Sequence, residues 1–305
     1  PCYNYGRFLG DALASLLGGP SSLGQLPTPT FQAFEVIIVD DASEDDSAAT
    51  ALALADPWRG VRVIPLTENH GTPGAINAGI ERAYGRYVTV LSADDLMQPD
   101  RLERLWRAAE EHPTQVICDD LRVLVNGKLG ERWGLPPYDP LTIAIKNSMH
   151  AGIFYPRAWW QELGGYPVNM VYGREDWAFN VGLSRKGHHG LLLDYAGYIY
   201  RRHGGNRSER NRGEQWRARF LEQLNSLYPE LYTLEGDMCC GQRARTAPTP
   251  KVKALAVKAV NLPGATGMVL LEYTGRNSGL VSWWGPSGTR YEVSAAKRRF
   301  YVDIR

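Results

Sequence analysis

Pairs of adjacent carboxylates follow two apolar runs of the sequence. The run "VIIV" ends at Asp40 and Asp41, and the run "VTVLSA" ends at Asp94 and Asp95. An aspartate at such a place can cap the next helix by accepting a backbone N–H. It can also help to hold a hard cation, Mg²⁺ or Mn²⁺, together with phosphate oxygens. A cap uses one carboxylate, whereas a metal–diphosphate site accounts for a pair, and both alternatives stay open at this point.

Strand-like and helix-like segments alternate over the first 120 residues and would position these carboxylates. Apolar runs predict strands at 34–43, 61–66 and 86–95, and helical spacing is found at 6–17, 45–55, 71–85 and 99–112. This alternation predicts βαβ units, hence an α/β fold with a mostly parallel sheet that helices flank. Ligands of such sheets bind outside the carboxyl ends of the strands, where both acidic pairs are expected.

The alternation ends near residue 115. We expect a hairpin at 115–133 with its turn at Asn126-Gly127, and helices and strands at 174–187, 189–203 and 213–231. Residues 243–251, rich in Pro, Thr and Arg, indicate a linker. Four or five short strands are expected after it. The predicted domains are therefore an α/β domain at 1–242 and a small all-β module at 252–305.

The bulk composition is that of an ordinary globular protein, with 44% hydrophobic and 22% charged residues. No apolar run is long enough for a membrane-spanning helix. Four cysteines are too few for a disulfide framework, so we expect a reducing, cytoplasmic setting. The sequence opens inside a motif, "PCYNYG", which leads us to expect a missing strand in front of it.

Charge is unevenly distributed along the chain. Residues 1–184 contain 14 Lys+Arg and 23 Asp+Glu, a net charge of −9, and residues 185–305 contain 20 and 10, a net charge of +10. A basic rear half suggests a polyanionic partner. The alternative is an arginine-rich surface that only keeps the protein in solution.

Several motifs, taken in their order, resemble those of the family 2 glycosyltransferases with the GT-A fold. They are "PCYN", "VIIVDDAS", "ENHGTPGAINAGIERAYGRYVTVLSADD", "ELGGYPVNMVYGREDWAF" and "YRRHGGNRS", and the resemblance runs from residue 1 to about residue 230. It implies a GT-A domain with a Rossmann-like sheet and the transfer of a sugar from a UDP-sugar to an acceptor hydroxyl. It also implies a site for the donor. The donor-binding residues implied are Pro1, Tyr3, Asn4, Asp40, Asp41, Ser43, Asn69, Gly71, Asn77, Ser92, Ala93 and Asp94.

The same resemblance implies roles within this site. Asp40 matches the acid that reads the base, typically uracil. Asp94, Asp95 and His203 match positions that hold Mn²⁺ or Mg²⁺. Two positions depart from the family pattern: Ser92 stands where an aspartate is frequent, and Ile76 where an arginine is frequent. These departures leave open a protein of another class, an inactive transferase fold that serves as a binding module.

The catalytic residues implied by the resemblance are Asp176 and Glu175. An inverting displacement needs a base that takes the proton of the acceptor hydroxyl while a metal stabilises the leaving diphosphate. Asp176 fits the position of that base better than Glu175. The alternative for Asp176 is an acid favoured at the start of a helix by the helix dipole.

The acceptor has to be inferred from weaker signals. The candidate acceptor-binding residues are Trp159, Trp160, Trp177, Arg201, Arg202 and Arg207. The "Gln-x-x-Arg-Trp" motif of processive synthases is absent, which favours a single transfer. The C-terminal module resembles one that recurs in bacteriophage proteins, and with the basic rear half it suggests duplex DNA carrying 5-hydroxymethylcytosine, modified in the cytoplasm of a host cell. The alternative acceptors are a saccharide, a lipid-linked sugar or a protein.

Overall fold

The computed structural model describes residues 1–55, 60–140, 143–144, 146–206 and 214–229, and the backbone of five strands between 257 and 303. The side chains of Glu214, Gln215 and Arg217 are outside this description. The chain divides into two compact units, Pro1–Leu234 and Glu235–Arg305. The predicted linker 243–251 lies outside the described residues, and the predicted domain boundaries stay a prediction.

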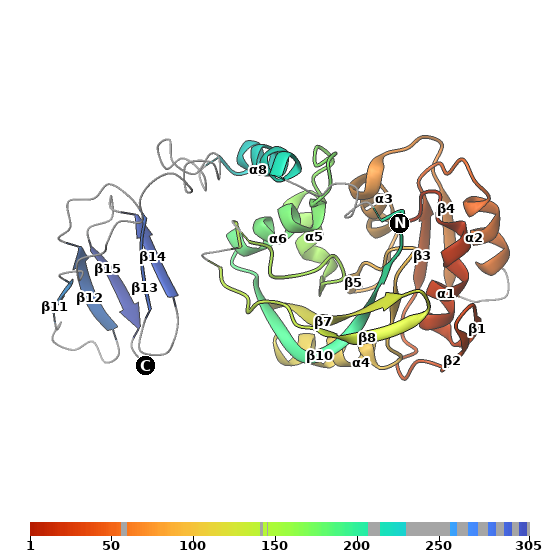
Figure 1. Cartoon of the computed structure of the whole chain (residues 1–305), viewed down its shortest axis with the longest axis horizontal. Coiled ribbons are helices and arrows are strands. Elements are labelled where there is room, and N and C mark those ends of the chain that lie inside the picture. Colours follow the sequence, from red (N-terminus) through yellow and green to blue (C-terminus); the bar gives the residue numbers. More distant parts are fainter. Residues whose placement is uncertain are drawn as a thin grey trace. The chain divides into compact units, whose positions relative to one another are not determined.

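The first unit alternates helices and strands along the chain (Figure 1). Its helices are α1 (Gly6–Leu17), α2 (Ser47–Ala55), α3 (Gly71–Glu81), α4 (Arg101–Glu111), α5 (Arg157–Leu163), α6 (Glu175–Arg185) and α8 (Glu214–Leu227). Its strands are β1 (Gly19–Ser21), β2 (Gly24–Leu26), β3 (Val36–Asp40), β4 (Val61–Pro65), β5 (Tyr87–Thr89), β6 (Leu96–Met97), β7 (Gln115–Val125), β8 (Lys128–Trp133), β9 (Phe154–Pro156) and β10 (His189–Arg202).

Helices cover both faces of β3, as its apolar run requires. Ile38 packs with Leu9 and Leu13 of α1 in one buried cluster. The neighbouring side chains Ile37 and Val39 point to the opposite face, because side chains alternate along a strand, and there they lie beside Gly79 of α3. A strand buried on both faces is apolar at nearly every position. This explains why the run of apolar residues before Asp40 is uninterrupted.

The strand pairing is mixed. β3 pairs with β4 in parallel, and β7 pairs with β10 in parallel. β9 is antiparallel to both β5 and β7, and β6 is antiparallel to β10, in a sheet of order β5-β9-β7-β10-β6. The α/β class is confirmed, and the described strands mix parallel and antiparallel pairs where a mostly parallel sheet was expected. Parallel neighbours need a long crossover, usually a helix, and β6 and β9 are short strands that enter the sheet from loops.

Two local predictions are confirmed by the backbone. β7 and β8 form the expected hairpin, and Asn126 and Gly127 have φ of 49° and 73°, as a two-residue hairpin turn requires. α6 begins at Glu175 and is buried on nearly all sides from Trp177 to Leu183, within the largest apolar cluster of the unit. The helix that carries the two candidate catalytic acids is therefore rigidly held.

The second unit is described by its backbone strands alone. They are β11 (Val257–Val260), β12 (Met268–Tyr273), β13 (Leu280–Trp284), β14 (Arg290–Ser294) and β15 (Arg299–Asp303). β12 pairs antiparallel with β11 and β15, and β13 pairs antiparallel with β14. These five strands agree with the number expected from the sequence. In the described part of the chain, no helix combines the length and the apolar character needed to cross a membrane.

Candidate active site

The loop after β3 is tied to the first residues of the chain. Asp40 is buried, and its carboxylate accepts hydrogen bonds from the Ser43 hydroxyl (2.6 Å) and the Ser43 backbone N–H (3.1 Å). The backbone N–H of Asn4 donates to the Ser43 hydroxyl oxygen at 2.9 Å, and the Asn4 side-chain oxygen accepts from Glu44 N–H at 2.8 Å. These contacts hold Asp40, Ser43 and Asn4, three of the predicted donor-binding residues, together at the carboxyl end of β3.

Asp41 anchors the loop that leads into α3. Its carboxylate accepts from the backbone N–H of His70 at 2.8 Å, and its carbonyl oxygen accepts from the side-chain amide of Asn69 at 3.0 Å. Asn69 in turn accepts from the N–H of Gly71, which has φ of 71°. Burial raises the pKa of Asp41, against the His70 hydrogen bond, which lowers it. The predicted donor residues Asn69 and Gly71 therefore stand beside the Asp40 loop.

Asp94 lies at the centre of a second cluster. Its Oδ2 atom is 3.0 Å from His203 Nε2 and accepts a hydrogen bond from Asn206 Nδ2 at 3.2 Å. His203 Nδ1 accepts from the backbone N–H of Gly205 at 3.1 Å. A neutral imidazole has one N–H and one acceptor nitrogen, so we assign the proton to Nε2, which donates to Asp94. Ligation of a cation by His203 Nε2 would require the Gly205 contact to rearrange.

The segment Pro1–Tyr5 joins the two clusters. The Tyr5 ring packs edge-on against His203 with 5.4 Å between the ring centroids, and its hydroxyl donates to Gly205 O at 2.8 Å. Pro1 O accepts from Ala93 N–H at 3.3 Å, and Cys2 bridges to Asp40. The Asp40 loop and the Asp94 cluster thus lie at one edge of the fold.

The carboxylate of Asp95 is held by donors of the protein. It is buried, Tyr198 OH donates to its Oδ2 at 2.7 Å, and the backbone N–H of Arg201 donates to its Oδ1 at 2.9 Å. Burial, followed by the neighbouring charge of Asp94, raises the pKa of Asp95 well above its usual range. A carboxyl group whose two oxygens face protein donors supports the turn instead of holding a cation. The geometry therefore does not favour Asp95 as a metal ligand.

Arg201 is committed to the scaffold. Its Nη2 donates to Asp11 Oδ2 of α1 at 2.7 Å, its Nε donates to the carbonyl oxygen of Asp94 at 2.9 Å, and its side chain is only 12% exposed. This arrangement disfavours the predicted contact of Arg201 with an acceptor. Arg202 is exposed, and Arg207 lies outside the described residues. Asp11 was not among the predicted residues, although an aspartate within the apolar run "DALASLL" is a signal that could have pointed to it.

The described residues suit a cation whose coordination is completed by a bound ligand such as a diphosphate. They contain no group of three or more His, Cys, Asp or Glu side chains that could hold a metal ion. Asp94 and His203 supply at most two protein ligands. Mg²⁺ and Mn²⁺ at phosphate sites typically take one or two carboxylates and complete their coordination with phosphate oxygens and water. The donor set therefore suits a cation shared with a diphosphate and does not suit a site made of protein ligands alone.

Glu175 and Asp176 form the first turn of α6. Arg174 precedes them in the left-handed conformation, with φ of 66°, which sets the entry into the helix. Glu175 is buried, whereas Asp176 is half-buried and its Oδ2 lies 3.5 Å from the side-chain amide of Asn147. Asp176 is therefore the acid of the pair that a bound ligand can reach more easily. It belongs to a segment separate from Asp94, as a base opposite the leaving group requires.

Asn77 of α3 positions the loop that leads toward α6. Its Oδ1 accepts from Trp160 Nε1 at 2.9 Å and from Tyr166 N–H at 2.7 Å, and its Nδ2 donates to Tyr166 O at 2.8 Å. These bonds satisfy the amide within the protein. This geometry does not favour the predicted contacts of Asn77 with the donor and of Trp160 with the acceptor.

The two other tryptophans proposed for the acceptor are also held by the protein. Trp177 is buried in the core, and its Nε1 donates to Ile143 O. Trp159 stacks on His188 with 3.7 Å between the ring centroids. The structure does not gather the predicted aromatic residues at a common surface beside Asp176. Among the predicted donor contacts, Tyr3 is the exposed aromatic ring, with 41% of its surface accessible.

Replacing Gly165 with Ala should test how closely Asn77 holds this loop. Gly165 has φ of +95°, and a Cβ atom there would lie 2.9 Å from Asn77 Oδ1. Gly164 has φ of +74° with no atom near the position of its Cβ, so Gly164→Ala is a matched control for backbone strain alone. We expect Gly164→Ala to lower the free energy of unfolding by about 1–2 kcal/mol and Gly165→Ala to lower it further, measured by urea denaturation. Equal losses would show that the Asn77 contact is unimportant.

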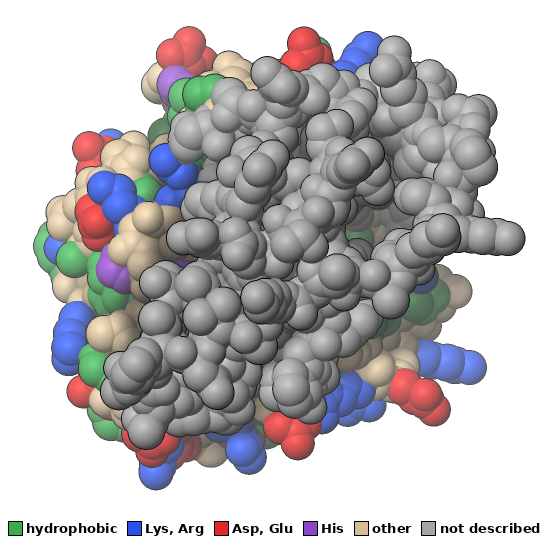
Figure 2. Space-filling model, turned by 90° about the vertical axis from the view of Figure 1, so that its left-hand side faces the viewer, with side chains coloured by type: hydrophobic (Ala, Val, Ile, Leu, Met, Phe, Trp, Pro, Cys, Tyr) green, Lys and Arg blue, Asp and Glu red, His purple; other side chains and the backbone are tan. Residues whose placement is uncertain are grey.

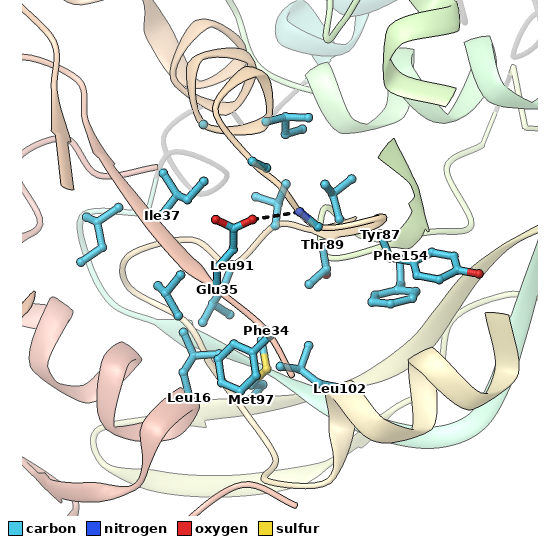
Figure 3. A pocket seen from close by; sticks show the side chains of 18 of the residues that line it. Leu16, Phe34, Glu35, Ile37, Tyr87, Thr89, Leu91, Met97, Leu102 and Phe154 are labelled. Carbon is cyan, nitrogen blue, oxygen red and sulfur yellow. Dashed lines mark hydrogen bonds between the residues drawn. The ribbon is translucent and has the colours of Figure 1, made fainter. Parts of the chain in front are cut away.

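A large apolar cavity of ≈ 740 Å³ lies between β3 and β5 (Figure 3). Its lining includes Ile37, Leu91, Met97 and Leu102, and the carboxylates of the two clusters are not part of it. A nucleotide-sugar is too polar for such a cavity. Pro1 and Cys2 also line the cavity.

Comparisons with known proteins agree with the motifs. The model described as "Glycosyl transferase family 2" matches residues 1–175. The succinoglycan biosynthesis protein ExoO of Rhizobium meliloti (strain 1021) is 44% identical over 90 residues, which are 30% of this chain and 25% of that protein. The chain thus spans about a quarter of the length of this relative.

Two solved structures share the fold. S. aureus TarS (residues 1–349) in complex with UDP-GlcNAc has a TM-score of 0.58 and 19% identity over 78% of this chain and 66% of that chain. The mannosyltransferase PcManGT of Pyrobaculum calidifontis, in complex with GDP-Man and Mn²⁺, has a TM-score of 0.55 and 16% identity over 75% and 62% of the two chains. At these identities the likeness shows the fold alone.

Proposed function

Since this chain belongs to glycosyl transferase family 2, we propose that it moves a sugar from a nucleotide-sugar donor to an acceptor hydroxyl. The observation that carries this proposal is the junction of the Asp40 loop with the Asp94–His203 pair through the segment Pro1–Tyr5. Asp40 would then contact the base, and Asp94 would lie near the cation and the diphosphate. One nucleoside diphosphate could reach both places. The resemblance of residues 252–305 to a bacteriophage module stays a prediction.

We propose UDP as the nucleotide of the donor. The hydrogen bonds of Ser43 fix the carboxylate of Asp40 for contact with the base. Tyr3 offers an exposed ring that can stack on the base. The UDP-GlcNAc complex of TarS supports this choice, while the GDP-Man complex of PcManGT makes a guanine nucleotide the comparison to test.

The proposed mechanism is a single displacement with inversion. Asp176 takes the proton of the acceptor hydroxyl as its oxygen forms a bond to the anomeric carbon, and the bond between that carbon and the diphosphate oxygen breaks. A divalent cation, Mn²⁺ or Mg²⁺, held by Asp94 and the diphosphate would neutralise the charge of the leaving group. Asp95, Tyr198 and Arg201 keep Asp94 in place.

For the acceptor we propose a saccharide or a lipid-linked sugar. Arg201, a candidate acceptor-binding residue in the basic rear half of the chain, is bound to Asp11. The described side chains visible in Figure 2 carry both signs of charge, interspersed around the face. The name of ExoO, a protein of succinoglycan biosynthesis, also supports a glycan. A hydroxymethylated base in duplex DNA and a protein are the alternative acceptors.

The test is a turnover assay with a panel of donors and acceptors. The protein would be incubated with Mn²⁺ and each of several UDP- and GDP-sugars, with oligosaccharides, with a lipid-linked sugar, and with duplex DNA that does or does not contain 5-hydroxymethylcytosine. We expect nucleotide release with a UDP-sugar and labelling of a glycan acceptor. If only the modified duplex is labelled, the acceptor is DNA and the proposal of a glycan acceptor is wrong. If the protein neither hydrolyses nor transfers any of the donors, the result would favour the inactive binding module.

A further inference from the structure

Asn206 is the residue that connects the parts of the Asp94 cluster. Its side chain lies beside Asp94, it follows β10 by four positions, and the residue is only 3% exposed. Its Nδ2 donates to Asp94 Oδ2 at 3.2 Å and to the carbonyl oxygen of Arg201 at 3.0 Å. Its Oδ1 accepts from the backbone N–H of His203 at 2.6 Å. One amide thus holds a carboxylate, a strand end and the backbone of the candidate metal-binding histidine.

We propose that Asn206 is a positioning residue that orients Asp94, directly and through the loop of His203, for a cation bound together with a donor diphosphate. This inference rests on the proposed function. The sequence pattern did not point to Asn206, because an asparagine after "RRHGG" is equally expected in an ordinary turn.

The hydrogen-bond geometry explains how the orientation arises. Asn206 Nδ2 and His203 Nε2 both reach the same oxygen of Asp94. Two donors on one carboxylate oxygen restrict rotation of the carboxyl group, which otherwise turns easily because this torsion is broad. A cation then meets a carboxylate whose orientation is already set.

The same amide also holds the loop that carries the imidazole. The backbone N–H of His203 donates to Asn206 Oδ1, which closes the loop 203–206 on itself. Phe8 and Tyr5 pack on the imidazole at 4.7 Å and 5.4 Å between ring centroids. Without the amide, the aromatic contacts remain, but the hydrogen bonds to Asp94, to Arg201 and to the backbone N–H of His203 are lost. We therefore expect the loss to fall on the cation site more than on the fold.

The test is the binding of UDP and Mn²⁺ to the variant Asn206→Ala. Residues that orient metal ligands typically contribute about 10–100-fold to metal affinity. We expect the affinity for UDP in the presence of Mn²⁺, measured by calorimetry, to fall by about this factor. The affinity for uridine, which lacks the diphosphate, should stay unchanged. Tyr138→Phe, which removes the hydrogen bond to the Ser184 hydroxyl elsewhere in the fold, is the matched control and should bind both ligands as the wild type does.

A double-mutant cycle with Asp94→Ala identifies the route of the effect. If Asn206 acts through Asp94, the variant Asp94→Ala/Asn206→Ala should bind UDP with Mn²⁺ as weakly as Asp94→Ala alone. Additive losses, or an equal loss of uridine affinity in Asn206→Ala, would overturn the proposal. If instead Asp94→Ala leaves the Mn²⁺ dependence of UDP binding intact, the proposed cation site itself has failed. The two failures are therefore distinguishable.

Discussion

Replacing Asp176 with Asn is expected to lower kcat by about 10²–10⁴-fold, the usual contribution of a general base. Asparagine keeps the size of the side chain and its place at the start of α6, but it cannot take the acceptor proton. The donor site lies on other segments, around Asp40 and Asp94, so the affinity for UDP should stay as in the wild type. Steady-state kinetics of sugar transfer and a calorimetric titration of UDP would measure the two effects separately.

The competing role for Asp176 is that of a helix-terminal acid. In that case the same variant would lose about 0.3–1 kcal/mol of stability, the typical interaction of an acid with the helix dipole, and would keep its activity. A fully active Asp176→Asn would therefore contradict the assignment. Asn147→Ala, which removes the 3.5 Å contact to Asp176, is expected to change kcat much less. Comparing kcat of the two variants distinguishes the general base, Asp176, from the residue that only contacts it, Asn147.

Replacing Arg101 with Met should cause a large loss of stability. Arg101 and Asp119 are buried completely, with 2.8 Å between Arg101 Nη2 and Asp119 Oδ1. Arg101 Nη2 also donates to Gly152 O at 2.6 Å. Removing one partner of a buried pair leaves the other charge without compensation and costs about 3–5 kcal/mol. We expect a loss of this size in the free energy of unfolding, measured with urea.

The same ion pair supports the candidate site from a distance. Burial would raise the pKa of Asp119, but Arg101 and His150 lower it below its usual range, so the carboxylate stays charged. Asp119 Oδ2 accepts from the backbone N–H groups of Gly197 and Tyr198 at 2.8 and 3.1 Å, where the pairing of β10 with β7 shifts its register. This bulge places Tyr198, whose hydroxyl binds Asp95. Arg101→Met should therefore also weaken the Asp94 cluster.

An exposed pair on the same helix is the control for this prediction. Arg107 and Glu103 of α4 are 2.6 Å apart, but the Arg107 side chain is 66% exposed. Surface pairs of this kind contribute about 0–1 kcal/mol, so Arg107→Met should be nearly neutral. A loss in Arg101→Met no larger than that in Arg107→Met would contradict the role of the buried pair.

The elements of the fold could largely be predicted from the sequence. Apolar runs and helical spacing are local signals, so β3, α4 and the hairpin of β7 and β8 agree with the expected segments. The arrangement of the sheet could not be predicted in the same way. β6 is a two-residue strand, and it joins the sheet by pairing with Tyr198 and Ile199, about a hundred residues away along the chain. Such a pairing leaves no periodic pattern in the sequence.

In the candidate site, too, some residues could be predicted from local motifs and others could not. The motifs pointed to Asp40, Asp94 and His203, and the structure brings the last two into contact. They could not show that Arg201 is bound by Asp11, because the two residues are 190 positions apart and their pairing leaves no pattern in the sequence. Asn206 was missed for a similar reason: its function depends on partners that only the folded loop brings together. Motifs thus indicate which residues meet a ligand, whereas the residues that hold them emerge from the fold.

Calorimetric titration of UDP into the wild-type protein, with Mn²⁺ and then with a chelator, tests the central claim most directly. The claim is that Asp94 holds a divalent cation against the diphosphate of a nucleotide-sugar donor. We predict that Mn²⁺ tightens UDP binding in the wild type and that Asp94→Ala abolishes this dependence while uridine binding remains. Absence of UDP binding, or a dependence on Mn²⁺ that survives in Asp94→Ala, would contradict the account.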